Sequence, residues 1–163
     1  MIDRHTVANR LIESYNRYMA DQDPKKGLVS AWLKVPGYDK MFYGRAYEHP
    51  VSKKWIHGER ACIDTALDRI YKGNIVDKKL PLGCEMITTL EPCTQFMPTR
   101  SGCSCSELIQ QHRIDRVYCG ARDPWHYVDG KPPFHPFKLI MTNNQAALER
   151  CQQLFSRLGS LED

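Results

Sequence analysis

Apolar residues recur at intervals of three and four along four segments of the chain, and this spacing predicts helices. The first segment is residues 3–20, whose apolar positions are Val7, Leu11, Tyr15, Tyr18 and Met19. Residues 57–71 follow the same period and end before Gly73, and residues 105–112 predict a short third helix. Asn143 or Asn144 can cap a fourth helix, whose apolar face is formed by Ala147, Leu148, Cys151, Leu154, Phe155 and Leu158.

Short apolar runs between these segments predict five strands. They are residues 28–35, 41–47, 85–90, 116–120 and 137–141. Residues 123–136 contain four prolines and are therefore expected to form a loop. The alternation of helices and strands favours an α/β fold, which we expect to be a three-layer α/β/α sandwich.

Composition agrees with a folded domain and adds little about function. The chain has 163 residues, 42% apolar and 26% charged, which is a usual balance for a globular protein and argues against a disordered or membrane protein. The formal net charge of +4 is a mild bias. It is compatible with an anionic small molecule or with RNA and requires neither.

The cysteines point to a reducing compartment. The chain has seven, an odd number, whereas a secreted disulfide framework prefers an even number and a signal peptide. The first residues, MIDRHTVANR, are charged and lack the apolar run of a signal. We therefore expect a cytoplasmic protein whose thiols serve packing, metal binding or catalysis.

One histidine and two of the cysteines have the order and placement of zinc ligands. His57 opens the second predicted helix, Cys93 follows the third predicted strand, and Cys105 begins the next helix. Three such ligands leave a fourth position on zinc for water. Glu59 lies two residues beyond His57, where a carboxylate can act as general acid and base rather than as a ligand. These are the groups that hydrolytic deamination of a heterocycle requires.

The motif H-x-E, followed by P-C and a further cysteine, is the pattern of the zinc deaminases. The sequence resembles the cytidine/deoxycytidylate deaminase superfamily over most of residues 28–158. TLEPC (89–93) and GARDP (120–124) are similar to segments of tRNA adenosine deaminases and riboflavin-pathway pyrimidine deaminases. The resemblance implies a five-stranded mixed sheet with helices on both faces, Zn²⁺ as cofactor, and a homodimer. It also implies that His57, Cys93 and Cys105 bind the zinc and that Glu59 is the general acid and base.

Residues 94–104 separate Cys93 from Cys105 by more than the tight spacing common in the superfamily. A longer spacing also occurs in riboflavin-pathway deaminases and argues against the tRNA-deaminase type. Cys103 is the alternative third ligand. Counting on from Cys105, the apolar residues that follow fall in the register with which the family packs this helix and strand; they are Leu108, Ile109, Ile114 and Val117. That register is lost from Cys103, and we therefore favour Cys105. Packing roles are expected for the other four cysteines, which are Cys62, Cys84, Cys119 and Cys151.

Five residues are candidates for substrate binding: Glu48, Pro92, Arg100, Asp123 and Trp125. Glu48 stands just after the second strand, where the family often has an asparagine that contacts a ribose, so a different polar partner is expected. Arg100 could meet a phosphate or carboxylate. Asp123 could cap a turn or touch substrate, and Trp125 could stack on a base or cover the sheet edge.

The sequence favours a hydrolase that releases ammonia from an amino-substituted nucleobase-type heterocycle, as free base, nucleoside or nucleotide. We expect one domain over residues 1–163, with a helix in 1–27, a catalytic core in 28–142 and a C-terminal helix in 143–163. The alternative is a deaminase acting on a base within tRNA or single-stranded nucleic acid, although no run of Lys and Arg is evident that would follow a phosphate backbone. A zinc-stabilised interaction module without catalysis is the second alternative.

Overall fold

A six-stranded mixed sheet organises the chain. The computed structural model describes residues 1–94, 103–124 and 127–160, the last four of these by backbone alone. The sheet order is β3-β2-β1-β4-β5-β6. Its strands are β1 (Lys26–Lys34), β2 (Phe42–Glu48), β3 (Trp55–Ile56), β4 (Glu85–Leu90), β5 (Arg116–Ala121) and β6 (Lys138–Met141). The pairs from β3 to β4 are antiparallel, and β4, β5 and β6 run parallel to one another.

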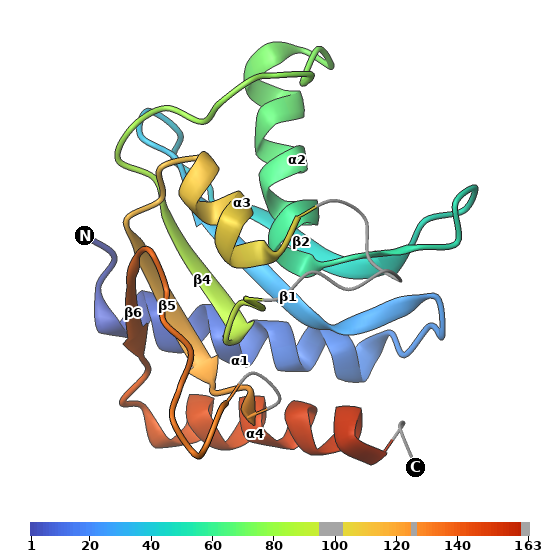
Figure 1. Cartoon of the computed structure of the whole chain (residues 1–163), viewed down its shortest axis with the longest axis vertical. Helices are drawn as coiled ribbons and strands as arrows, with labels where there is room; N and C mark the ends of the chain where they lie inside the picture. The colour runs from blue at the N-terminus through green and yellow to red at the C-terminus, as the bar shows by residue number, and fades with distance from the viewer. Residues whose placement is uncertain (95–102, 125–126, 161–163) are drawn as a thin grey trace.

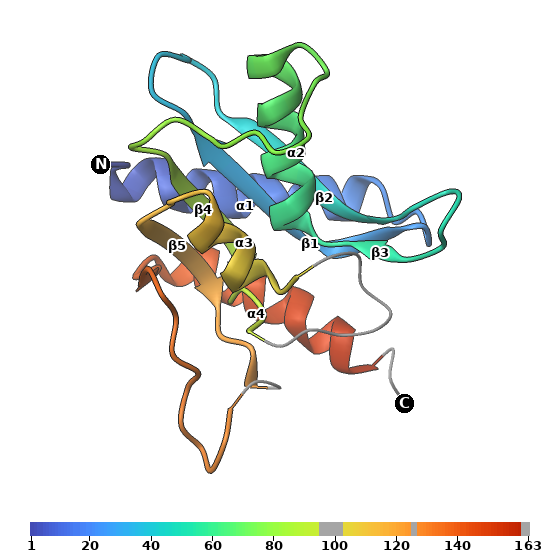
Figure 2. The same cartoon turned by 45° about the horizontal axis from the view of Figure 1, so that its top comes forward.

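Two helices cover each face of the sheet (Figure 1 and Figure 2), which confirms the three-layer sandwich. α1 (Arg4–Ala20) and α4 (Gln145–Ser160) pack on one face, over a core that includes Leu11, Trp32 and Ile87. α2 (Gly58–Tyr71) and α3 (Cys105–Gln111) pack on the other. Neighbouring residues of one strand, such as Trp32 and Leu33, face opposite cores because side chains alternate along a strand.

The sheet has six strands, so the expectation of five was wrong. The additional strand, β3, is only two residues long and pairs with the end of β2, Tyr47 with Ile56 and Glu48 with Trp55. A pair of residues is too short to show an alternating pattern, and its pairing with β2 defines it. The first strand also begins at Lys26, two residues before the expected start.

The functional end of the fold is set by strand direction. β4 and β5 are parallel neighbours, so their carboxyl ends meet at one edge of the sheet. In open α/β sheets this edge is where ligands bind. The antiparallel β1 begins at the same edge, and α2 and α3 start there as well. Within the described ranges, no helix is both long enough and apolar enough to cross a lipid bilayer.

Candidate functional site

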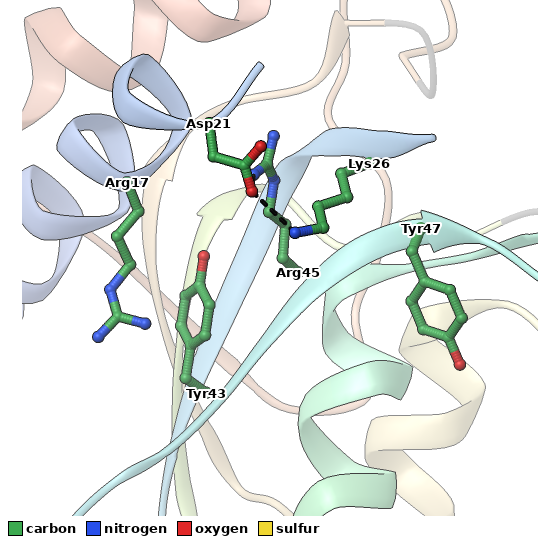
Figure 3. A pocket seen from close by; sticks show the side chains of 6 residues that line it. All are labelled: Arg17, Asp21, Lys26, Tyr43, Arg45 and Tyr47. Carbon is green, nitrogen blue, oxygen red and sulfur yellow. Dashed lines mark hydrogen bonds and ion pairs between the residues drawn. The ribbon is translucent and has the colours of Figure 1, made fainter. Parts of the chain in front are cut away.

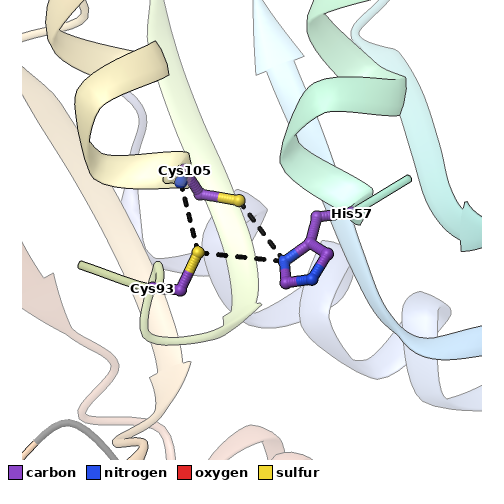
Figure 4. Close-up of side chains that lie close together, drawn as sticks. All are labelled: His57, Cys93 and Cys105. Carbon is purple, nitrogen blue, oxygen red and sulfur yellow. Dashed lines mark hydrogen bonds between the residues drawn. The ribbon is translucent and has the colours of Figure 1, made fainter. Parts of the chain in front are cut away.

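Three predicted ligand side chains meet at this edge of the sheet. His57 Nδ1 lies 3.9 Å from Cys93 Sγ and 3.4 Å from Cys105 Sγ. All three ligand atoms lie within 4.8 Å of one another, and Figure 4 shows the ring and both sulfurs pointing toward a common centre. Both cysteines are buried and His57 is half-buried. Among the described residues, no other group of His, Cys, Asp or Glu converges in this way.

The spacing of these atoms fits a tetrahedral zinc ion. Bonds of about 2.3 Å to sulfur and about 2.0 Å to nitrogen place neighbouring sulfur and nitrogen ligands roughly 3.6 Å apart. The two sulfur–nitrogen distances, 3.4 and 3.9 Å, bracket this value. One imidazole and two thiolates are also the soft donor set that zinc prefers. The residues present therefore suit a zinc ion with three protein ligands and one open position.

The backbone holds the ligands in place. His57 is the N-cap of α2, and Gly58 lets this helix approach β1, since a Cβ at Gly58 would lie 2.7 Å from the Val29 carbonyl oxygen. Cys105 is the first residue of α3. Its backbone N–H donates to Cys93 Sγ at 3.2 Å, and the N–H of Ser106 donates to the Cys93 carbonyl at 3.0 Å. The loop after β4 thus satisfies two donors that the start of a helix leaves free.

Glu59 contacts both Cys105 and the strand β4. The residue is 2% exposed, and its Oε2 accepts from Cys105 Sγ at 3.4 Å while Oε1 accepts from Thr88 Oγ1 at 3.4 Å. Burial raises the pKa of the Glu59 carboxyl above its usual range, although the nearby His57 works in the opposite direction. A carboxyl with a raised pKa beside a metal site is suited to carrying a proton.

Cys105 rather than Cys103 joins the ligand group. Cys103 is half-buried and packs against the core beneath α2 and α3. The remaining four cysteines are buried. Burial raises the pKa of Cys84 to about 11 and that of Cys151 to about 12, and it raises the pKa values of Cys62 and Cys119 as well. These four stay as thiols at neutral pH, as their expected packing role requires.

A buried carboxylate that the sequence reasoning did not single out, Glu91, joins the two motifs TLEPC and GARDP. Its side chain is 0% exposed. It accepts from Arg122 Nη1 at 3.2 Å and from the Asp123 backbone N–H at 3.2 Å. Its Oε2 lies 2.7 Å from His135 Nε2. Burial alone would raise the pKa of Glu91, but these hydrogen bonds and charges outweigh it and hold the pKa below its usual range.

His135 extends this contact to the helix that carries Cys105. Its side chain is 4% exposed, and its Nδ1 lies 3.0 Å from Ser106 Oγ, whose second partner is the Pro92 carbonyl at 3.5 Å. The connection Ser106–His135–Glu91 has the order of a nucleophile, base and orienting acid. Ser106 is only 4% exposed, however, so these residues link segments rather than attack a substrate. The sequence signal that could have indicated Glu91 is its place inside the TLEPC motif, directly after a predicted strand.

The structure describes three of the five substrate-binding candidates. Pro92 is buried, and the backbone N–H of Asp123 donates to Glu91, the residue before Pro92. Glu48 lies at the end of β2, paired with Trp55 two residues before His57, and does not belong to the metal-ligand group. Arg100 and Trp125 lie outside the described residues.

The comparison of sequences defines the class of protein. Residues 5–121 match the family of the cytidine and deoxycytidylate deaminase zinc-binding region, which is more than half of the chain. This chain therefore belongs to that deaminase family. No curated protein sequence matches it.

Solved structures share the fold. A diaminohydroxyphosphoribosylaminopyrimidine deaminase/5-amino-6-(5-phosphoribosylamino)uracil reductase from Thermotoga maritima aligns with 96% of this chain at 21% identity and a TM-score of 0.59, and this chain spans 42% of that protein's length. A tRNA:A34 deaminase studied for A-to-I editing aligns with 93% of this chain and 99% of its own at 20% identity and a TM-score of 0.55. A guanine deaminase from Nitrosomonas europaea aligns with 91% of this chain and 84% of its own at 14% identity and a TM-score of 0.56.

Proposed function

We propose that the protein is a zinc-dependent hydrolytic deaminase that releases ammonia from an amino-substituted nucleobase-type heterocycle, as free base, nucleoside or nucleotide. The observation that carries the proposal is the buried Glu59 carboxylate, whose Oε2 lies 3.4 Å from Cys105 Sγ. A zinc site with a purely structural role has no use for a buried acid beside its ligands. The same position is the one a proton carrier needs in hydrolysis.

Each residue of the site has a defined task in this reaction. His57 Nδ1, Cys93 Sγ and Cys105 Sγ would hold the ion. Zinc, when bound, supplies Lewis-acid activation of water. Glu59 accepts a proton from the attacking water and delivers it to the departing amino group. The water oxygen thereby replaces the amino nitrogen on the ring carbon, and ammonia leaves.

The similar structures support a nucleobase-type substrate, since they are named for a pyrimidine derivative, guanine and a tRNA adenosine. A deaminase acting on a base within tRNA or a single strand is the second candidate. It is favoured by the alignment that covers 99% of the tRNA:A34 deaminase chain. Three expectations from the sequence stay predictions. They are the homodimer, the cytoplasmic location, and contacts with substrate by Glu48, Pro92, Arg100, Asp123 and Trp125.

Ammonia release tests the proposal directly. The zinc-loaded chain is incubated with a panel of bases, nucleosides and mononucleotides, and separately with tRNA and single-stranded RNA and DNA. We expect release from at least one small compound. Release from polymers alone favours the second candidate. If a stoichiometrically zinc-loaded chain releases ammonia from none of these compounds, both are wrong.

A further inference from the structure

Three cations from three different elements line a recess of about 380 Å³ between the end of α1 and the strands β1 and β2. Figure 3 shows the side chains around it. We call it the cationic recess, and its lining residues are Arg17, Asp21, Lys26, Tyr43, Arg45 and Tyr47. A second recess of about 490 Å³ shares Tyr43, Arg45 and Tyr47 with it. Volumes of this size are typical of small-molecule sites.

The cationic recess has more positive than negative charge. Asp21 Oδ2 is shared between Lys26 Nζ at 2.7 Å and Arg45 Nη1 at 3.6 Å. Arg17 pairs with Glu13 at 2.9 Å. Glu13 also pairs with Arg10 at 2.7 Å. Four cations therefore share two carboxylates, and positive charge is in excess. An anion that enters the recess meets this excess.

Arg45 has a donor that no described residue satisfies. Its Nε donates to the Gly27 carbonyl at 2.8 Å, and its side chain is 11% exposed. Among the described residues, its Nη2 is buried and has no hydrogen-bond partner. An unpaired donor of a buried guanidinium is unfavourable because it has lost water without gaining an acceptor. Asp21 lies 3.6 Å from Nη1, so it offsets the charge of this guanidinium only in part.

The recess also presents an aromatic ring. Tyr43 is already engaged, since the Arg17 guanidinium lies 4.4 Å from its ring centre and the Trp32 ring lies 4.6 Å away. Tyr47 is 37% exposed and borders both recesses. Its ring can accept a planar group by stacking, in the way that aromatic side chains accept nucleobases.

One end of the recess lies at the strand pair that leads into the metal-ligand group. Tyr47 pairs with Ile56 across β2 and β3, and Ile56 directly precedes His57. One antiparallel cross-strand step and one residue along the chain place the Cα atoms of Tyr47 and His57 within about 10 Å of each other. The recess is lined in part by α1 residues, on the other face of the sheet from α2 and α3, so a ligand in it would occupy a site separate from the metal centre but near the same edge of the sheet.

We propose that the cationic recess binds the phosphate of a nucleotide, with Lys26 and Arg45 on the phosphate oxygens and the base on Tyr47. The inference rests on the proposed function, and it adds that the protein binds phosphorylated compounds. A phosphate suits two cations that share a single carboxylate, because charged donors bind phosphate oxygens strongly and a guanidinium can do so through two N–H groups. The phosphate can come from a free nucleotide, which makes the recess a second nucleotide site, or from a strand, in which case the recess holds a nucleotide flanking the deaminated base.

Binding is measured by calorimetry on the zinc-loaded Glu59→Gln chain, so that no ligand is consumed. The ligands are inorganic phosphate, 5′-mononucleotides and a single-stranded RNA oligonucleotide. Lys26→Gln is expected to weaken nucleotide binding about tenfold, the loss of one charge-assisted hydrogen bond. Lys25→Gln is the matched control, since Lys25 is exposed, is next in sequence and does not line the recess. Lys26 is also exposed, so we expect its substitution to leave the fold intact even if an Arg45 variant does not fold.

Tyr47→Leu distinguishes binding of the base from binding of the phosphate. We expect it to weaken nucleotide binding about fivefold or more and to leave phosphate binding unchanged, because it removes only the stacking surface. Tighter binding of mononucleotide or of RNA identifies the source of the phosphate, and either result supports the recess. Equal affinities in Lys26→Gln and Lys25→Gln, or no binding of any of the three ligands, overturn it. Since binding is read without turnover, a chain that deaminates but shows no Lys26-dependent binding defeats this inference alone. A chain that binds in this way without deaminating defeats only the proposed function.

Discussion

The contact of His135 with Glu91 makes a strong prediction about stability and metal affinity. In His135→Ala the buried Glu91 carboxylate loses a hydrogen bond of 2.7 Å and keeps, within the described part of the chain, Arg122 and the Asp123 N–H, each at 3.2 Å. A hydrogen bond to a charged group contributes about 1.5–3 kcal/mol, and a buried charge left with poorer partners costs somewhat more. We therefore expect the free energy of unfolding to fall by about 2–4 kcal/mol. For a chain of this length the corresponding decrease in Tm is roughly 5–15 °C.

The same substitution should weaken zinc binding, since Ser106 loses its contact with His135 and is adjacent to Cys105. Loss of a group that supports a metal ligand typically lowers metal affinity about 10–100-fold. Urea denaturation measures the stability, and competition with a chelator measures the zinc affinity. His135→Gln is expected to recover part of both, because its amide nitrogen can replace Nε2 as the donor to Glu91.

His5→Ala is the matched control, since His5 is an exposed residue of α1. It should change neither quantity by more than about 0.5 kcal/mol, as is usual for surface substitutions. A His135→Ala variant as stable as His5→Ala, with the same zinc affinity, would refute the view that His135 connects the loop after β5 to α3, the helix that carries Cys105.

Three further predictions concern the ligands, pH and the close approach of α2. Cys105→Ser should lower zinc affinity by more than about 100-fold, while Cys103→Ser leaves it unchanged. Elemental analysis of the zinc content of both variants checks this, and loss of zinc from Cys103→Ser alone would make Cys103 the ligand. Burial, with help from nearby cations, lowers the pKa of His112 from 6.5 to about 4, so the unfolded chain binds a proton that the folded chain excludes. Stability should therefore fall by up to about 3 kcal/mol as the pH drops from 6.5 to 4, and this decrease should be absent from urea denaturation of His112→Asn. Gly58→Ala forces a Cβ to within 2.7 Å of the Val29 carbonyl oxygen, and calorimetry should show about 1–3 kcal/mol of destabilisation, whereas an unchanged Tm would mean that α2 can move away.

The parts of the protein that depend on local spacing could be predicted from the sequence. The metal-ligand group follows from short motifs placed at strand and helix ends, and the structure brings His57, Cys93 and Cys105 together. The choice of Cys105 rested on the register of the apolar residues after it. All four of these residues, Leu108, Ile109, Ile114 and Val117, are buried in one core.

Local patterns were less informative where a single tertiary contact decides burial. The apolar positions of the first helix predicted that Met19 would face the core, but Met19 is 40% exposed and Ser14 is buried instead. Trp32 Nε1 donates to Ser14 Oγ at 2.9 Å, so a polar residue of the helix faces the sheet with its hydrogen bond satisfied.

Contacts between distant segments left no pattern in the sequence. Glu91 and His135 are 44 residues apart, and no periodicity relates them. Arg17, Lys26 and Arg45 likewise belong to three different elements, so the search for a run of basic residues could not find the cationic recess. Strand pairing brings such residues together. A single sequence indicates a strand through the alternation of apolar and polar residues, and β3, with two residues, is too short to show it.

The central claim is that Glu59 carries protons beside a zinc ion held by His57, Cys93 and Cys105. The most direct test compares ammonia release by the zinc-loaded wild type and by Glu59→Gln on the best compound of the panel, with zinc content measured on both. We predict equal zinc content and a rate lowered about 100-fold or more, since general acid and base catalysis contributes about 10²–10⁴-fold. Equal rates at equal zinc content would contradict the claim.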